Sequence, residues 1–159
     1  MTTARDNSIV ALMIPPFDDA GNLPPGIHWA TWDELVERFG TSPYRNQLLD
    51  GLRRALHSLA YAGCQIAYID GSFVTAKEIP GDFDACWDSR DVDGDRLDPV
   101  LLDFTNRRAA QKAKYGGELF PSISLADPAG NTFLEFFQVD KSTGDAKGII
   151  AIDLKKVLL

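Results

Sequence analysis

The hydrophobic and polar positions along the chain change their period several times, which predicts helices and strands in mixed order. Residues 43–62 place leucines and alanines at three- and four-residue steps, so they predict a long helix with one apolar face. Thr31, followed three residues later by Glu34, predicts the start of a shorter helix that ends near Gly40. Short apolar runs predict strands at residues 65–69, 82–87, 120–126, 132–139 and 148–154.

The remaining segments complete the predicted fold. Residues 73–77 predict a short helix, and residues 97–115 predict a longer one that is broken near Thr105. The turn residues at 127–131 predict a hairpin between the strands at 120–126 and 132–139. We therefore expect an α+β fold, in which a mixed β-sheet of about five strands is covered by helices mainly on one face.

The length of 159 residues is that of one domain with a substantial core. We expect residues 1–159 to form this single domain, with residues 1–30 as an N-terminal proline-rich arm. Aromatic and aliphatic side chains in the arm predict that it packs on the body of the protein. It could cover an active site, form a contact in a homodimer, or serve only as a structural wrap.

The net charge of −7 argues against broad binding to nucleic acids, which requires a basic face. A local basic group remains at Arg107, Arg108, Lys112 and Lys114, and it is either a solvated helix face or a contact for phosphate or RNA. No apolar stretch approaches the roughly 20 residues that span a bilayer, and no secretion signal is visible. We expect a cytoplasmic protein without a membrane partner, with Cys64 and Cys86 as reduced thiols.

Candidate chemistry concentrates between residues 71 and 84. Gly71 and Ser72 follow an apolar run, and Asp82 comes ten residues after Ser72, with Asp84 two residues further. Residues two apart in a strand point to the same face, so these two carboxylates would repel each other unless a cation lies between them. Mg²⁺ binds one or two carboxylates together with water and phosphate oxygens. The Gly-Ser turn offers backbone N–H groups and a hydroxyl to such phosphates.

This pattern resembles the nucleotidyltransferase superfamily of the polymerase-beta type, in its minimal form. The resemblance implies that Gly71 and Ser72 lie against a nucleoside triphosphate and that Asp82 and Asp84 ligate Mg²⁺. It also implies a third catalytic, metal-binding carboxylate on a later strand, for which Glu135 is the best match. Asp140 and Asp153 are weaker alternatives.

Two further residues are assigned with this resemblance in view. Glu135 lies in an apolar run, where an acid is costly to bury without a partner, and a metal would supply one. Lys77 lies within two helical turns of Ser72, so it could bind a nucleotide phosphate or be a solvated lysine. The chain departs from the family pattern because it has no Gly between Ser72 and Gly81.

The resemblance implies a Mg²⁺-dependent nucleotidyltransferase that moves a nucleoside monophosphate from an NTP to a hydroxyl. The acceptor would be a protein, an RNA or a small molecule, and small relatives of this kind act in toxin–antitoxin or phage-defence systems. The alternative is a catalytically inactive nucleotidyltransferase fold, which would bind nucleotides or act as an antitoxin-like protein-interaction module.

Overall fold

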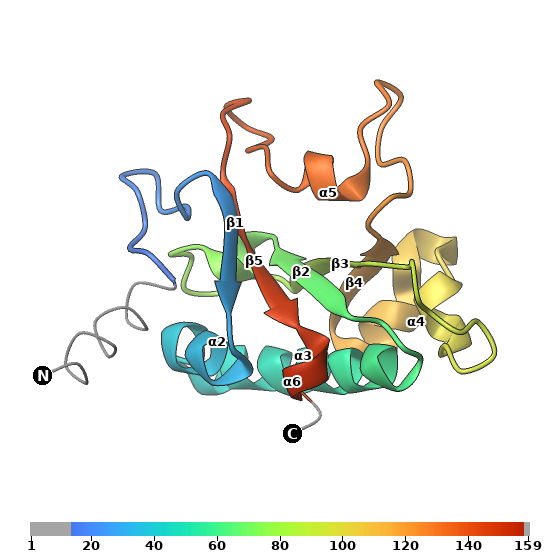
Figure 1. Ribbon diagram of the computed structural model, residues 1–159. Helices are drawn as coiled ribbons and strands as arrows, with labels where there is room; N and C mark the ends of the chain where they lie inside the picture. Colours follow the sequence, from blue (N-terminus) through green and yellow to red (C-terminus); the bar gives the residue numbers. More distant parts are fainter. Residues whose placement is uncertain (1–13, 158–159) are drawn as a thin grey trace, which may run out of the picture.

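The computed structural model describes residues 14–157, and within this range five strands form one mixed sheet (Figure 1). The outer pairs β1–β5 and β3–β4 are parallel, whereas the central strand β2 is antiparallel to both of its neighbours. This arrangement confirms the predicted α+β fold with a mixed sheet. In spatial order the strands are β1 (Gly26–Ala30), β5 (Gly148–Asp153), β2 (Ile66–Asp70), β3 (Phe83–Trp87) and β4 (Gly117–Pro121).

Helices cover mainly one face of this sheet. Figure 1 shows α2 (Trp32–Phe39), α3 (Pro43–Tyr61) and α6 (Leu154–Val157) on that face. Helix α4 (Thr105–Tyr115) connects β3 to β4, while the short helix α5 (Phe133–Phe136) lies over the opposite face. The face that carries α5 therefore has fewer helices over it than the opposite face.

Local signals in the sequence set the ends of α2 and α3. The Thr31 hydroxyl accepts a hydrogen bond from the Glu34 amide, and the Glu34 carboxylate accepts one from the Thr31 amide. This reciprocal pair satisfies two N–H groups that the helix leaves free. Ser42 caps α3 through its hydroxyl, which accepts from the Arg45 amide, and Pro43 occupies the first helical position. Both helix predictions are confirmed.

Successive side chains of β3 point to opposite faces of the sheet. Phe83 and Ala85 are fully buried in the main core, which α3 covers. Asp84 and Cys86 point to the opposite face, where Cys86 packs with Phe137 in a smaller apolar cluster. The polar positions of β3 therefore lie on the face that α3 leaves uncovered.

Of the predicted hairpin between residues 120–126 and 132–139, only a turn closed by one antiparallel bridge, Leu125 with Thr132, is confirmed, and the two predicted strands are wrong. Strand β4 begins at Gly117 and ends at Pro121, and residues 133–136 form α5 instead of a strand. A second capping box explains the change, because Thr132 and Glu135 bond to each other's amides as Thr31 and Glu34 do. A short apolar run cannot distinguish strand from helix by its period alone.

Three smaller predictions have mixed outcomes. Residues 26–30, expected within the arm, form β1 at the edge of the sheet, although residues 1–13 lie outside the described part of the chain. The helix expected at residues 73–77 is a single 3-10 turn, Ser72–Val74. The break near Thr105 is confirmed, because a 3-10 turn, Pro99–Leu102, precedes α4.

Within residues 14–157 the helices are too short or too polar to cross a membrane.

Candidate functional site

Three carboxylates meet where β3 and β4 begin. One carboxylate oxygen from each of Asp82, Asp84 and Glu118 lies within 4.8 Å of the other two. Asp84 and Glu118 are direct neighbours in the parallel β3–β4 register, and Asp82 lies two positions before Asp84. The side-by-side placement of Asp82 and Asp84 agrees with the two-residue period of a strand.

The third acid of this cluster is Glu118, and Glu135 lies elsewhere. The Glu135 side chain is exposed on α5, where its carboxylate accepts hydrogen bonds from the amide and hydroxyl of Thr132. The weaker candidates, Asp140 and Asp153, also lie outside the cluster. The sequence signal for Glu118 is weak, because residues 117–121 do not alternate between polar and apolar and the adjacent glycines Gly116 and Gly117 resemble a single turn.

The carboxylate cluster is electrostatically unfavourable without a cation. Burial, together with the negative charges of Asp82, Glu118 and Asp70, raises the pKa of Asp84 to about 7. Burial, followed by the charge of Glu118, also raises the pKa of Asp82. Burial and like charges both disfavour the ionised form of a carboxyl group. A divalent cation would reverse this effect by supplying the missing positive charge.

An arginine already occupies one side of the cluster. The Arg108 guanidinium donates a hydrogen bond to the Glu118 carboxylate and forms an ion pair with it. Arg108 belongs to the first turn of α4, where Asn106, Arg107 and Arg108 all have positive φ angles between 51° and 61°. Such left-handed backbone costs roughly 1–2 kcal/mol per residue outside glycine. The rest of the fold must therefore stabilise the turn that presents Arg108 to Glu118.

A groove of about 410 Å³ opens beside Asp84. Its wall includes the Gly-Ser pair predicted to bind phosphate, and two lysines contribute positive charge to it. Lys77, the predicted phosphate ligand, does not line it and is exposed to solvent instead. The groups that could bind an anionic ligand belong to Gly71, Ser72, Thr75, Lys141 and Lys147, whereas Asp70, Asp84 and Asp140 add negative charge to the same wall, which a cation would have to offset.

Gly71 is required for the close approach of β2 and β3. Its φ of 85° and ψ of −175° lie in a region that only glycine occupies readily. A Cβ atom at this position would lie 2.6 Å from Oδ2 of Asp84. Because a side chain is excluded here, the Asp84 carboxylate packs directly against the backbone of the turn.

Lys147 connects the groove to a buried acid. Its ammonium lies 3.3 Å from a carboxylate oxygen of Asp70, which is 4% exposed. Burial raises the pKa of Asp70, and the charge of Lys147 partly offsets that shift. The pair fixes the Lys147 ammonium at the groove wall, where Asp70 balances its charge.

A second groove, of about 490 Å³, opens at Asp82. Helix α3 contributes Tyr44 and Arg54 to its wall, and the end of α4 contributes Lys112 and Lys114. Asp82 lines this second groove, whereas Asp84, its neighbour in the cluster, lines the first. A ligand in the first groove would therefore meet Asp84, and a ligand in the second would meet Asp82.

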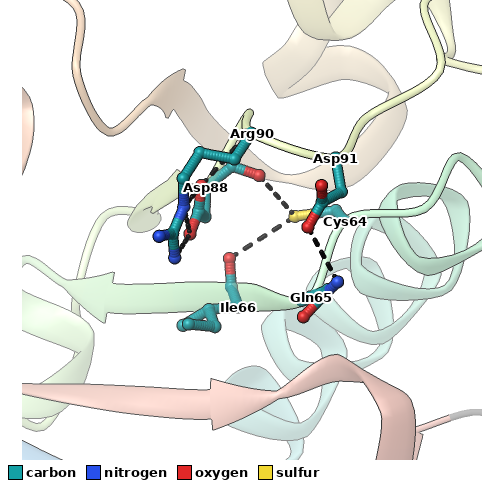
Figure 2. A network of polar contacts seen from close by, with 6 residues as sticks. All are labelled: Cys64, Gln65, Ile66, Asp88, Arg90 and Asp91. Atoms are coloured by element: carbon teal, nitrogen blue, oxygen red, sulfur yellow. Dashed lines mark hydrogen bonds and ion pairs between the residues drawn. The ribbon is translucent and has the colours of Figure 1, made fainter.

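The cysteines take no part in this site. Figure 2 shows Cys64, just after the end of α3, where its thiol donates to the carbonyl oxygens of Ile66 and Asp88 at 3.4 and 3.3 Å. Burial raises the pKa of Cys64 to about 11, so the thiol is protonated and a poor metal ligand at neutral pH. The ion pair of Asp88 with Arg90 lies within the loop after β3, and the Gln65 amide donates to the Asp91 carboxylate at 2.8 Å, which ties this loop to the start of β2 (Figure 2).

Fold and site together define an α+β protein with an oxygen-only carboxylate cluster beside a groove of about 410 Å³. Residues 15–153 match the family described as "Family of unknown function (DUF6932)", and the chain belongs to that family. No curated protein and no solved structure matches it.

Proposed function

We propose that this protein is a Mg²⁺-dependent nucleotidyltransferase, which moves a nucleoside monophosphate from an NTP to a hydroxyl acceptor. The observation that supports the proposal is the convergence of Asp82, Asp84 and Glu118 beside the groove that contains Gly71 and Ser72. The resemblance noted in the sequence involves the same residues, apart from Glu118. Glu118 takes the place for which Glu135 was the sequence candidate.

The donor set fits a hard divalent cation. All three side chains offer only oxygen, which Mg²⁺ prefers. Burial first, and then neighbouring negative charge, raises the pKa values of Asp82 and Asp84, and a cation would offset both effects. Asp82, Asp84 and Glu118 would hold the ion. When bound, Mg²⁺ neutralises charge on the phosphates and favours deprotonation of an attacking hydroxyl.

The chain's own groups supply binding and orientation. In the first groove, the Ser72 hydroxyl and the ammonium groups of Lys141 and Lys147 would bind phosphate oxygens. The second groove, which opens at Asp82, would receive the acceptor. In this division, the acceptor hydroxyl and the α-phosphate would meet at the carboxylate cluster, which contributes Asp82 to one groove and Asp84 to the other.

A second function is favoured by one observation, the ion pair of Arg108 with Glu118. If Arg108 keeps Glu118 neutralised, the fold would bind nucleotide or a protein partner without transferring anything, as an antitoxin-like module would. Both the transferase and the non-catalytic module would bind an NTP, and we propose that either one acts in the cytoplasm. A role in toxin–antitoxin or phage-defence pairs, an RNA acceptor and a homodimer remain parts of the proposal.

The test is transfer of label from each of the four α-³²P NTPs in the presence of Mg²⁺. Acceptors would be the protein itself, total RNA and a cell extract from which nucleotides have been removed. We expect label in one acceptor with wild-type protein, and at least a 100-fold loss with Asp82→Asn or Glu118→Gln.

Glu135→Gln is the matched control, because it makes the same chemical change on α5 and should retain transfer. Transfer that survives Glu118→Gln would contradict the proposed site. Nucleotide binding without any transfer would favour the second function.

A further inference from the structure

Two consecutive residues in the first turn of α3 contact the segment that joins the Gly-Ser turn to Asp82. This connecting segment, residues 73–81, contains no strand and only the end of a 3-10 turn, so its own hydrogen bonds leave much of its shape undetermined. Tyr44 and Arg45 bind five of its backbone carbonyl groups. The contacts run from one end of the segment to the other.

Arg45 contacts the first half of the connecting segment. Its Nη1 donates to the carbonyl oxygen of Phe73 at 2.7 Å. Its Nη2 donates to the carbonyl oxygens of Thr75 and Lys77 at 3.2 and 2.6 Å. One planar guanidinium therefore fixes three alternate peptide groups, which a single ammonium could not match in direction.

The burial of Arg45 is unusual for a charged side chain. The residue is 4% exposed, and within residues 14–157 no carboxylate forms an ion pair with it. Its charge is compensated by carbonyl dipoles and by the ring of Phe73, whose centroid lies 5.0 Å from the guanidinium carbon. An apolar side chain at this position would leave the carbonyl oxygens of the connecting segment without these donors, which is costly for buried groups. Arg45 therefore ties α3 to the connecting segment.

Tyr44 contacts the second half of the segment. Its hydroxyl lies 2.9 Å from the carbonyl oxygen of Gly81 and also contacts that of Pro80, so one O–H donor is shared between them. Gly81 directly precedes Asp82, the first acid of the cluster. Tyr44 is 38% exposed, so loss of its hydroxyl should not disturb the core.

We infer that Tyr44 and Arg45 are positioning residues, which hold the connecting segment in the shape that presents Ser72 and Asp82 to a common ligand. Neither residue needs to touch the ligand. Ser42 and Pro43 fix the start of α3, so the two side chains project from a rigid base onto both ends of the segment. The inference rests on the proposed function in one respect, namely that the ligand is a Mg²⁺-bound nucleotide.

The experiment combines hydrogen exchange with nucleotide binding, on full-length protein. Arg45→Lys keeps the positive charge but loses the planar guanidinium with its two Nη donors, and Tyr44→Phe removes only the hydroxyl. Arg53→Lys and Tyr61→Phe are matched controls, since both residues are exposed on the same helix and make no side-chain hydrogen bond within the described residues. Exchange would be followed in peptides covering residues 71–82, with peptides from β5 as an internal reference.

We expect Arg45→Lys and Tyr44→Phe to accelerate exchange at least tenfold in residues 71–82 and to leave β5 unchanged. In calorimetric titrations with Mg²⁺ and each of the four NTPs, both variants should raise the Kd at least fivefold, and both controls should match wild type. A purely structural role would instead lower the melting temperature and accelerate exchange throughout the protein.

The outcomes separate this inference from the function on which it rests. If wild-type protein binds none of the four nucleotides, the proposed function fails. If wild-type protein binds one of them, and Tyr44→Phe and Arg45→Lys bind it equally well, only the positioning role is overturned. Should Arg45→Lys fail to fold, Tyr44→Phe alone decides, because its ring remains in place.

Discussion

Replacing Asp84 by asparagine should stabilise the metal-free protein at alkaline pH. Asp84 is largely buried, and its pKa rises from 3.8 to about 7, first because of burial and then because of the charges on Asp82, Glu118 and Asp70. The folded state therefore binds the Asp84 proton more tightly than the unfolded state does. Stability falls as the pH rises through the window from about 4 to about 7, because folding then requires a buried carboxylate.

The structure sets the size of this effect. A shift of the pKa from 3.8 to about 7 corresponds to about 4 kcal/mol of unfolding free energy. This value is an upper limit, because Asp82, Glu118 and Asp70 can take up protons or move apart and so lower the repulsion on Asp84. Asparagine has the same shape and carries no charge at any pH. We expect Asp84→Asn to exceed wild type by about 1–4 kcal/mol at pH 8 and to equal it at pH 4.

Urea denaturation in the presence of EDTA measures this difference directly, with Asp145→Asn as an exposed control. Adding Mg²⁺ at ~10 mM, a saturating concentration for a typical site, should stabilise wild type at pH 8 and leave Asp84→Asn unchanged. The difference in unfolding free energy between the two proteins should therefore become smaller. An Asp84→Asn protein that is no more stable than wild type at pH 8 would refute the electrostatic reasoning.

Three further predictions concern single positions. Gly71→Ala should lower the free energy of unfolding by about 1–3 kcal/mol in urea denaturation, because its backbone conformation suits only glycine and its Cβ would meet Asp84; equal stability would contradict the close approach of β2 to β3. Gly51→Ala should cost at least about 1–3 kcal/mol by the same assay, since a Cβ there would lie 1.9 Å from the Tyr115 carbonyl oxygen; an unchanged midpoint would argue against this packing of α3 on α4. Cys64, with a pKa of about 11, should not react with a thiol reagent at pH 8 until the protein unfolds, and rapid labelling of the native protein would show that the thiol is accessible.

The elements that follow from the sequence are those whose signals are local. The capping box at Thr31 and Glu34 locates α2, and the apolar spacing of residues 43–62 locates α3. Alternation in β3 is sufficient to place Asp82 and Asp84 on one face. Each of these inferences depends on residues close together in the chain, so no tertiary information is needed.

The errors arise where tertiary pairing or adjacent signals decide the structure. Gly116 ends α4 with a φ of 83°, but Gly117 already belongs to β4, where a Cβ would lie 2.5 Å from the carbonyl oxygen of Phe83. Assigning both glycines to one turn displaces the strand and conceals Glu118. Thr132 and Glu135 have the same spacing as the capping pair Thr31 and Glu34, and they do cap a helix. The apolar residues around them also fit a strand, and the prediction of a strand relied on those residues instead of on the cap.

The strand β1 cannot be predicted from local pattern. Pro24 and Pro25 precede it and indicate a loop, and its strand conformation depends on parallel pairing with β5, more than 100 residues later in the chain. Such pairing is a property of the assembled sheet.

Anomalous diffraction from crystals grown with Mn²⁺ and a non-hydrolysable NTP analogue tests the central claim most directly. We predict a manganese peak between the carboxylates of Asp82, Asp84 and Glu118, with the phosphates in the groove beside Ser72. A nucleotide bound elsewhere, or manganese absent from these three side chains, would contradict the account.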